Sequence, residues 1–232
     1  GIAYMQKQEY ATAEAEFVKQ LEVNPKSSIV YTQIATARAR QGNLEGAEQA
    51  FKQGLDQLPD DARLLIVGLA PGLHGANATG RPFTGDYPGV LLYETLHQHG
   101  FASRRESVAS NDGLELFDCR ITNAVRCVPP QNKPVAEEVN NCNPYLAQEL
   151  ALVPEGGVVL ALGAIAHKAV VRALAGRQKD DPFAHAGRAN LERGMTLVDS
   201  YHCSRYNTQT RRLTADMFSD IFRLASSRLA RQ

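Results

Sequence analysis

The sequence has 232 residues, of which 44% are hydrophobic and 22% charged, and its formal net charge is zero. This length and apolar content are enough for one large or two small globular domains with cores of their own. No window approaches the roughly 18 consecutive apolar residues of a membrane-spanning helix, and Gly1 opens no charged and apolar leader, so we expect neither a membrane segment nor a secretory signal.

The four cysteines and the distribution of charge narrow the class of protein further. The cysteines are too few and too irregularly spaced for a secreted disulfide framework, which favours reduced thiols in a cytoplasm. Zero net charge by itself disfavours a nucleic-acid partner. The charge is segregated, however: residues 1–62 hold six basic and nine acidic side chains, whereas residues 201–232 hold six arginines and two aspartates. The C-terminal segment is therefore the part of the chain suited to a polyanion.

Residues 1–62 repeat themselves at a shift of 34 positions. The aligned pairs are Ala13 and Ala47, Glu14 and Glu48, Phe17 and Phe51, Leu21 and Leu55, and Pro25 and Pro59. This period resembles that of tetratricopeptide repeats, in which a small and a large residue four apart share one helix face. An ordinary amphipathic helical hairpin is the alternative. Such arrays bind peptides on a concave face, so a protein partner is expected for this segment.

From residue 63 the sequence alternates between strand and helix patterns. Short apolar runs that end in polar or glycine-rich turns occur at RLLIVGLAP, ELFDCRITNAV, GGVVLALG and GMTLVDSYH. Helical patterns between them are GVLLYETLHQHG, VAEEVNNCNPYLAQELALV and AIAHKAVVRALAG. This alternation predicts an α/β domain over residues 63–232, with a central parallel sheet and helices on both faces. Ligands of such folds bind at the carboxyl ends of the strands.

Three unusual loops follow these strands, at residues 68–86, 122–134 and 201–214. The first is rich in glycine but holds neither GxxxxGK[ST] nor a GxGxxG that opens a helix, which disfavours a phosphate-cradling loop. The second places Asn123 at a strand end, and the third places His202 directly after a strand. An aromatic ring, an amide and a histidine at one sheet edge suit a planar, polar heterocycle.

Together these loops carry a resemblance to a known family. GLAPG with GR-x-FTGD, T-N-x-V-R-C-x-PP and H-x-S-R-x-N-T-Q-T resemble the motifs of the uracil-DNA glycosylase superfamily, above all its family-5 (type B) members. The similarity covers roughly residues 63–225. It implies a three-layer α/β/α sandwich that hydrolyses the N-glycosidic bond of uracil, or of other deaminated bases, in DNA after flipping the nucleotide out of the stack. It also implies a monomer that works in a bacterial-type cytoplasm.

The resemblance implies a role for five residues around the base. Gly68 and Ala70 border the uracil, and Phe83, expected to be exposed after a glycine-rich turn, stacks on it. Asn123 reads N3–H and O4, because an amide offers an acceptor and a donor side by side. His202 donates to O2 as negative charge develops on the departing base, which is stabilisation of the oxyanion kind.

The residue that positions the attacking water is expected to differ from that of several relatives. Those superfamily members have an acidic residue where this chain has Ala70, an alanine that family-5 enzymes share. The resemblance moves water positioning to Asn77, with His74 as a weaker candidate. An asparagine holds water but is a poor base, so the catalytic pair Asn77 and His202 predicts slow or substrate-restricted activity.

The third motif is also expected to contact DNA. Ser204, Arg205 and Asn207 would approach backbone phosphates and the gap left by the flipped base, and Arg211 would add salt-dependent affinity or form part of a solvated basic face. The family usually has proline after its histidine, where this chain has Cys203. Because a proline stiffens the backbone, this cysteine predicts a looser loop.

Family-5 enzymes carry a [4Fe–4S] cluster on four cysteines. Cys127 and Cys142 match two of these ligands by their context, whereas the segment before the first strand contains no cysteine. Two thiolates cannot hold a cubane cluster. We therefore expect these residues to be incomplete remnants of the site, no intact cluster in this chain, and a reaction that needs no cofactor.

Two other functions compete with a DNA repair glycosylase. A non-catalytic interaction protein, with peptide-binding repeats and a degenerate glycosylase-like domain, would explain the missing cluster ligands. Binding of a free nucleobase or nucleotide is a further alternative. Retention of Phe83, Asn123 and His202 together favours the enzyme, since a decaying site has no physical need for all three.

Overall fold

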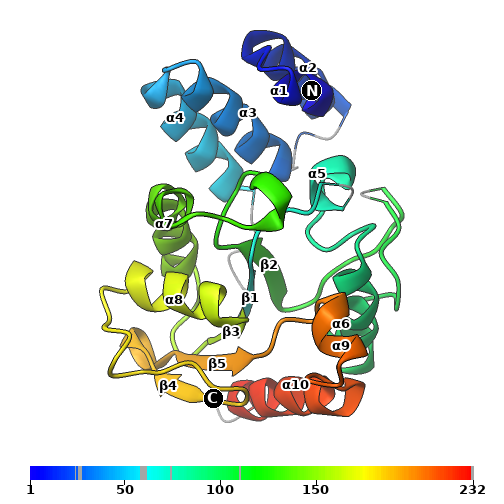
Figure 1. The fold of residues 1–232 in the computed structure, drawn as a ribbon, viewed down its shortest axis with the longest axis vertical. Helices are drawn as coiled ribbons and strands as arrows, with labels where there is room; N and C mark the ends of the chain where they lie inside the picture. Colours follow the sequence, from blue (N-terminus) through cyan, green and yellow to red (C-terminus); the bar gives the residue numbers. More distant parts are fainter. Residues whose placement is uncertain (24, 26–27, 58–61, 74, 110, 231–232) are drawn as a thin grey trace. The chain divides into compact units, whose positions relative to one another are not determined.

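The structure is a computed structural model that describes residues 1–23, 25, 28–57, 62–73, 75–109 and 111–230 (Figure 1). The chain divides into two compact units, Gly1–Pro59 and Asp60–Gln232. Within the described ranges, no helix combines the length and the apolar character needed to cross a membrane.

The first unit is helical. Its helices are α1 (Ile2–Gln6), α2 (Tyr10–Val23), α3 (Ser28–Arg40) and α4 (Leu44–Leu55), and α3 packs against both α2 and α4. Two of the pairs that match at a shift of 34 are buried in both copies, since Ala13, Phe17, Ala47 and Phe51 are each at most 3% exposed. The small and the large residue of each sequence repeat thus occupy equivalent core positions.

The second unit is built on a five-stranded sheet. Its strands are β1 (Leu64–Gly68), β2 (Cys119–Asn123), β3 (Val158–Leu162), β4 (Arg188–Asn190) and β5 (Thr196–Ser200), in the order β2-β1-β3-β5-β4. The first three pairings are parallel, which confirms an α/β fold with a central, mostly parallel sheet. The expectation of a wholly parallel sheet is wrong at one edge, because β4 pairs antiparallel to β5.

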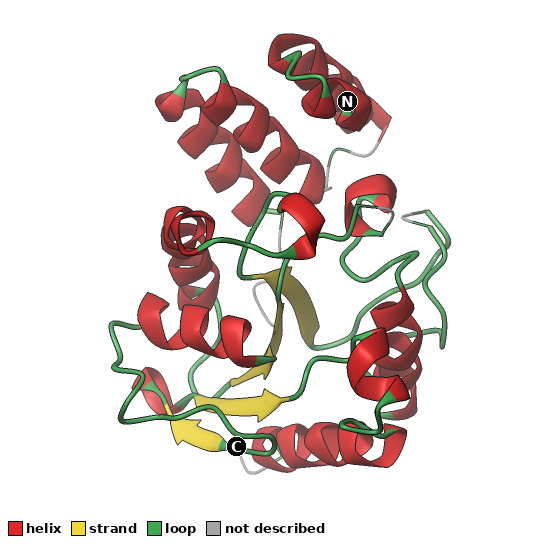
Figure 2. Cartoon of the chain, in the orientation of Figure 1, coloured by secondary structure: helices red, strands yellow, loops and turns green. Residues whose placement is uncertain are grey.

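Helices cover both faces of this sheet (Figure 2). The helices of this unit are α5 (Ala76–Thr79), α6 (Tyr87–Gln98), α7 (Ala136–Ala151), α8 (Ala164–Ala173), α9 (Arg205–Gln209) and α10 (Ala215–Leu229), with 3₁₀ turns at Pro130–Asn132 and Glu192–Gly194. One core lies between the sheet and α6 with α10, and the other between the sheet and α7 with α8.

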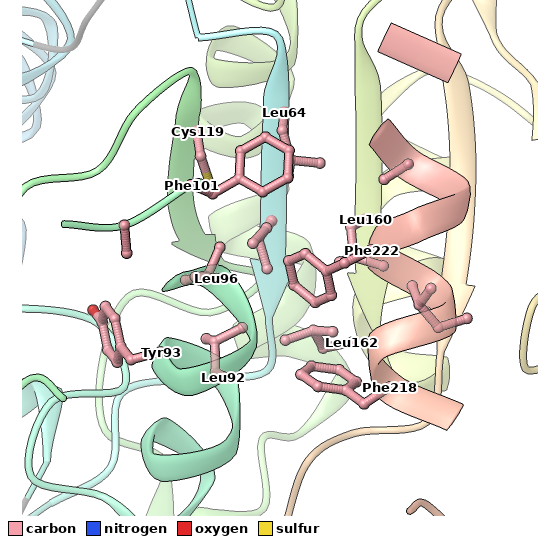
Figure 3. Close-up of a cluster of buried hydrophobic side chains, with 14 of the residues drawn as sticks. Leu64, Leu92, Tyr93, Leu96, Phe101, Cys119, Leu160, Leu162, Phe218 and Phe222 are labelled. Carbon is pink, nitrogen blue, oxygen red and sulfur yellow. The ribbon is translucent and has the colours of Figure 1, made fainter. Parts of the chain in front are cut away.

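Alternation along the strands creates the two cores. Leu64 and Ile66 belong to the first, whereas Leu65 and Val67, the residues between and after them, belong to the second. Figure 3 shows the first core, where Leu160 and Leu162 of β3 meet Phe218 and Phe222 of α10 together with Leu92 and Leu96 of α6. Each fully buried side chain of this size contributes about 1.5–3 kcal/mol. The sheet is thus a rigid base for the loops at its edge.

Strand order fixes where those loops meet. The chain leaves β1 for β2 on one side and later adds β3 on the other side of β1, which creates a topological switch point. In open α/β sheets, ligands bind in the crevice outside the carboxyl ends of the strands at such a point. Gly68 pairs in register with Asn123, so the first and second motifs begin side by side.

Candidate active site

A pocket of about 430 Å³ lies at the carboxyl ends of β1, β2 and β5. All three loops of the sequence analysis contribute to its lining. The lining residues are Leu69, Ala70, Gly72, Ala76, Phe83, Asp86, Pro88, Asn123, His202 and Ser204. Of the residues predicted to bind the base, Ala70, Phe83, Asn123 and His202 line it, whereas Gly68 does not.

Phe83 forms one wall of the pocket. The expectation that this side chain is exposed is wrong, since it is 7% exposed and belongs to the first hydrophobic core. Its backbone φ is +60°, a value that non-glycine residues rarely adopt. Its ring lies 6.1 Å from the His202 ring between centroids, with 32° between the planes. Phe83 is therefore a fixed aromatic surface beside the histidine.

Gly68 acts by leaving room for two neighbours. A Cβ at this position would collide with Asn123 Oδ1, and it would come within 2.7 Å of Phe83 Cζ. Glycine at the end of β1 thus allows the aromatic wall and the amide to approach the backbone closely. Its contribution to the site is steric and indirect.

Asn123 presents its amide at the end of β2. The residue is 7% exposed, and its buried Oδ1 accepts no hydrogen bond from the described residues. Buried polar atoms in proteins are nearly always paired, and leaving one unpaired costs about 1–3 kcal/mol. An acceptor left in this state on a pocket wall is a feature of a binding site, because a ligand N–H can satisfy it.

His202 is held in its neutral form. Burial lowers the pKa of His202 to about 4, so the imidazole carries one proton at neutral pH and can donate a single hydrogen bond. The loop packs closely here, since a Cβ on Gly163, whose φ is +95°, would lie 3.3 Å from His202 Cβ. Cys203, from which a looser loop was predicted, is fully buried in the core beside the histidine, and the looseness of the loop stays a prediction.

Asp86 is a pocket residue that the sequence analysis missed. It occupies the N-cap position of α6, yet its side chain makes no capping hydrogen bond. The carboxylate instead lies against the glycine-rich loop, where a Cβ on Gly72 or Gly75 would collide with it. An acidic residue just before a helix is ordinarily interpreted as a cap. The glycines that precede it by 11 and 14 positions were the available signal for a close approach.

Asn77, predicted to position water, lies in α5 and is half-buried. Its neighbour Ala76 lines the pocket, whereas Asn77 is not among the lining residues. The other candidate, His74, lies outside the described residues. The carboxylate that lines the pocket is therefore that of Asp86.

Comparisons with known proteins agree with this geometry. A model of the Uracil DNA glycosylase superfamily matches residues 55–225. The chain belongs to this superfamily. It is 47% identical over 170 residues to a Type-5 uracil-DNA glycosylase of Thermus thermophilus, covering 73% of this chain and 77% of that protein. Type-5 uracil-DNA glycosylases of Mycobacterium leprae and Pyrobaculum aerophilum are 45% and 41% identical, over 71% and 72% of this chain and 72% of each relative.

In the third motif, Ser204 and Asn207 form hydrogen bonds within the loop, whereas the arginines are exposed to solvent. Ser204 caps α9, where its Oγ accepts from Asn207 N at 3.4 Å, and Asn207 Nδ2 donates to the His202 carbonyl at 2.8 Å. Ser204 also lines the pocket, but Asn207 is committed to holding the loop. Arg205 and Arg211 are exposed, which leaves their charges available to phosphates.

The cluster expected for family-5 glycosylases does not fit the residues of this chain. Cys127 and Cys142 are half-buried, and Cys142 Sγ accepts from Arg126 N at 3.4 Å. Burial raises the pKa of the Cys142 thiol, which disfavours the thiolate that iron requires. Over the described part of the chain, no three His, Cys, Asp or Glu residues gather as metal ligands would. The other two cysteines, Cys119 and Cys203, are buried in the hydrophobic core.

An ion pair behind the pocket holds the strained loop in place. Arg81 Nη1 lies 2.7 Å from Asp112 Oδ1 and 2.9 Å from Ser107 Oγ, while Ser107 Oγ lies 2.6 Å from Thr84 Oγ1. Tyr93 Oη donates to the Pro82 carbonyl at 2.7 Å. These bonds act on both sides of Phe83 and oppose relaxation of its φ.

Asp112→Asn is expected to lower the free energy of unfolding by about 2 kcal/mol, because the Arg81 guanidinium loses a buried counter-charge. Burial alone would raise the pKa of Asp112, but bonds from Arg81 and three backbone N–H groups hold it well below its ordinary value. Its stabilisation is therefore complete at neutral pH and is lost as the pH falls below about 4. Urea unfolding followed by circular dichroism measures both effects. An unchanged midpoint at pH 7 would contradict this role.

Proposed function

We propose that this protein is a uracil-DNA glycosylase that hydrolyses the N-glycosidic bond between uracil and deoxyribose in DNA. The observation that carries the proposal is the convergence, in one pocket, of an aromatic wall, an unpaired amide oxygen, a neutral imidazole and a carboxylate. These groups match the needs of a flipped uracil and of an attacking water. Reaching the base requires that the nucleotide leave the stack, which is least costly for a mismatched base.

Base recognition rests on Phe83 and Asn123. The Phe83 ring offers a surface for stacking, and Asn123 Oδ1 accepts from uracil N3–H while its NH₂ donates to O4. Cytosine has an acceptor at N3 and a donor at its exocyclic amine, so the same amide would oppose like groups. Sites built on such bonds reject the wrong partner strongly, because buried polar groups are left unpaired.

Departure of the base rests on His202. As the C1′–N1 bond breaks, its electron pair moves onto uracil, and the neutral imidazole donates a hydrogen bond to O2 where negative charge develops. The low pKa of His202 means that it stabilises an anion without delivering a proton. This interaction is stronger in the transition state than in the ground state, as catalysis requires.

Attack by water rests on Asp86. The carboxylate accepts a proton from the water as the oxygen bonds to C1′, and the sugar passes through an oxocarbenium-like state. This assignment replaces Asn77 as the water-positioning residue and removes the reason to expect slow activity. Every step uses side chains of the chain and water, so uracil excision requires no cofactor.

The activity is tested by excision from duplex oligonucleotides that carry one uracil opposite guanine or adenine, followed by alkaline cleavage of the abasic product. Wild type is expected to give strand breaks, and Asn123→Ala is expected to lower kcat/KM by about 10²-fold, since two hydrogen bonds to the base are lost. Asn77→Ala serves as the matched amide control and should retain activity. A folded wild type that makes no breaks would identify a non-catalytic scaffold.

We further propose that α1–α4 form a tetratricopeptide-type module that binds a protein partner. The equivalent burial of Ala13 with Ala47, and of Phe17 with Phe51, supports this assignment. In such repeats each helix pair buries its apolar face against the next, and the exposed face is left for a peptide.

A further inference from the structure

A second hollow adjoins the catalytic pocket. It has a volume of about 500 Å³, and its walls include Tyr87, Val90 and Glu94 of α6 together with Thr208 and Arg211 of the third motif. Tyr87 lines this hollow, and its chain neighbours Asp86 and Pro88 both line the catalytic pocket. Figure 1 shows α6 and α9 side by side at this place, as the bond between Thr208 and Tyr87 requires.

The aromatic ring of Tyr87 is held in place by two neighbouring residues. Tyr87 is 41% exposed, and its hydroxyl bonds Thr208 Oγ1 at 3.2 Å. The Arg205 guanidinium lies over one face of this ring, with its carbon 4.8 Å from the ring centre, which leaves the other face for a base. Val90, on the next turn of the helix, is 64% exposed and extends the apolar surface. An exposed aromatic ring that carries an arginine on one face can stack an unpaired nucleobase on the other.

The charge at this hollow also favours a nucleotide. Arg211 lines the hollow and is exposed, Arg205 is exposed against Tyr87, and Glu94 is the acidic side chain on the α6 wall. The two arginines suit a phosphate of the strand. Because the hollow adjoins the pocket for the flipped base, a nucleotide bound there would belong to the same DNA strand.

We propose that this hollow is a subsite for the nucleotide next to the flipped uracil in the same strand. The neighbouring base lies against Tyr87, and its phosphate contacts Arg211. This proposal rests on the proposed function, since it names a second contact that the same DNA makes. It predicts that part of the affinity for substrate comes from one flanking base, whatever its identity, because stacking tolerates every base.

The test combines variants of the protein with variants of the DNA. Single-stranded oligonucleotides carry one central uracil, and a tetrahydrofuran abasic residue replaces its 5′ or its 3′ neighbour. In wild type, removal of one of these two bases is expected to raise KM about tenfold. In Tyr87→Ala, KM for the full substrate rises by a similar factor, and the same abasic replacement has no further effect. Tyr87→Phe keeps the ring and should behave as wild type does.

Phe117→Ala is the matched control, because Phe117 is an aromatic residue of the same unit that is 46% exposed and lies outside both hollows. It should leave the flanking-base effect unchanged. Equal abasic penalties in wild type and Tyr87→Ala, at both neighbours, would overturn the proposal. Fluorescence anisotropy with the same oligonucleotides measures the coupling as binding, so a wild type without glycosylase activity would refute the proposed function and still test the subsite.

Discussion

Asp86→Asn is expected to lower kcat for uracil excision by about 10²- to 10⁴-fold, because the amide keeps the shape of the carboxylate but cannot accept a proton from the attacking water. KM should change little, since Asp86 acts on water and leaves base recognition to other residues. The substitution also suits the local packing, as the side chain lies against Gly72 and Gly75, where a larger group would collide. Single-turnover kinetics with excess enzyme isolate the chemical step.

The control for this prediction is Asn77→Ala, which removes the other polar candidate from the same loop. Under the assignment to Asp86, its kcat stays within a few-fold of wild type. If Asp86→Asn kept wild-type kcat while Asn77→Ala lost it, water positioning would belong to Asn77 after all.

His202→Ala is expected to lower kcat by about 10²- to 10³-fold, the usual effect of removing one donor to a developing oxyanion. Because burial lowers the pKa of His202 to about 4, the wild-type rate should show no loss attributable to this residue between about pH 8 and pH 5.5. Below that range the imidazole begins to take a second proton. The pH profile of kcat in wild type and variant measures both effects.

His202→Gln is the informative companion, because its side-chain amide can still donate to uracil O2. It should recover part of the lost rate. A wild-type profile that falls with a midpoint near pH 6.5, and that becomes flat in His202→Ala, would mean that the histidine titrates at its ordinary pKa and works differently.

The framework of the glycosylase-like unit could be predicted because its strands are short apolar runs with clear turns. Leu64–Gly68 and Val158–Leu162 are buried at every position, and such runs are typical of central parallel strands. β4 escaped prediction for the opposite reason: Arg188–Asn190 is a three-residue edge strand with two exposed residues and no apolar alternation. β4 exists only through its pairing with β5, and the sequence gives no sign that these two segments lie side by side.

The position of a site residue could be predicted where that residue lies at the end of a strand or directly after it. Asn123 and His202 belong to this class, since the carboxyl ends of parallel strands meet at one edge. Asp86 does not, because only the folding of the glycine-rich loop brings Gly72 and Gly75 against its carboxylate. Phe83 was expected to be exposed because its loop is rich in glycine. Its positive φ instead directs the ring inward, where it is buried.

The central claim is that the pocket at the ends of β1, β2 and β5 releases uracil from DNA. Its most direct measurement is mass spectrometry of the free base liberated from a uracil-containing duplex by wild type and by the double variant Asp86→Asn with His202→Ala. We predict one equivalent of free uracil per site with an intact abasic strand from wild type, and none above background from the folded double variant. Equal release from both proteins, or no release from wild type, would contradict the claim.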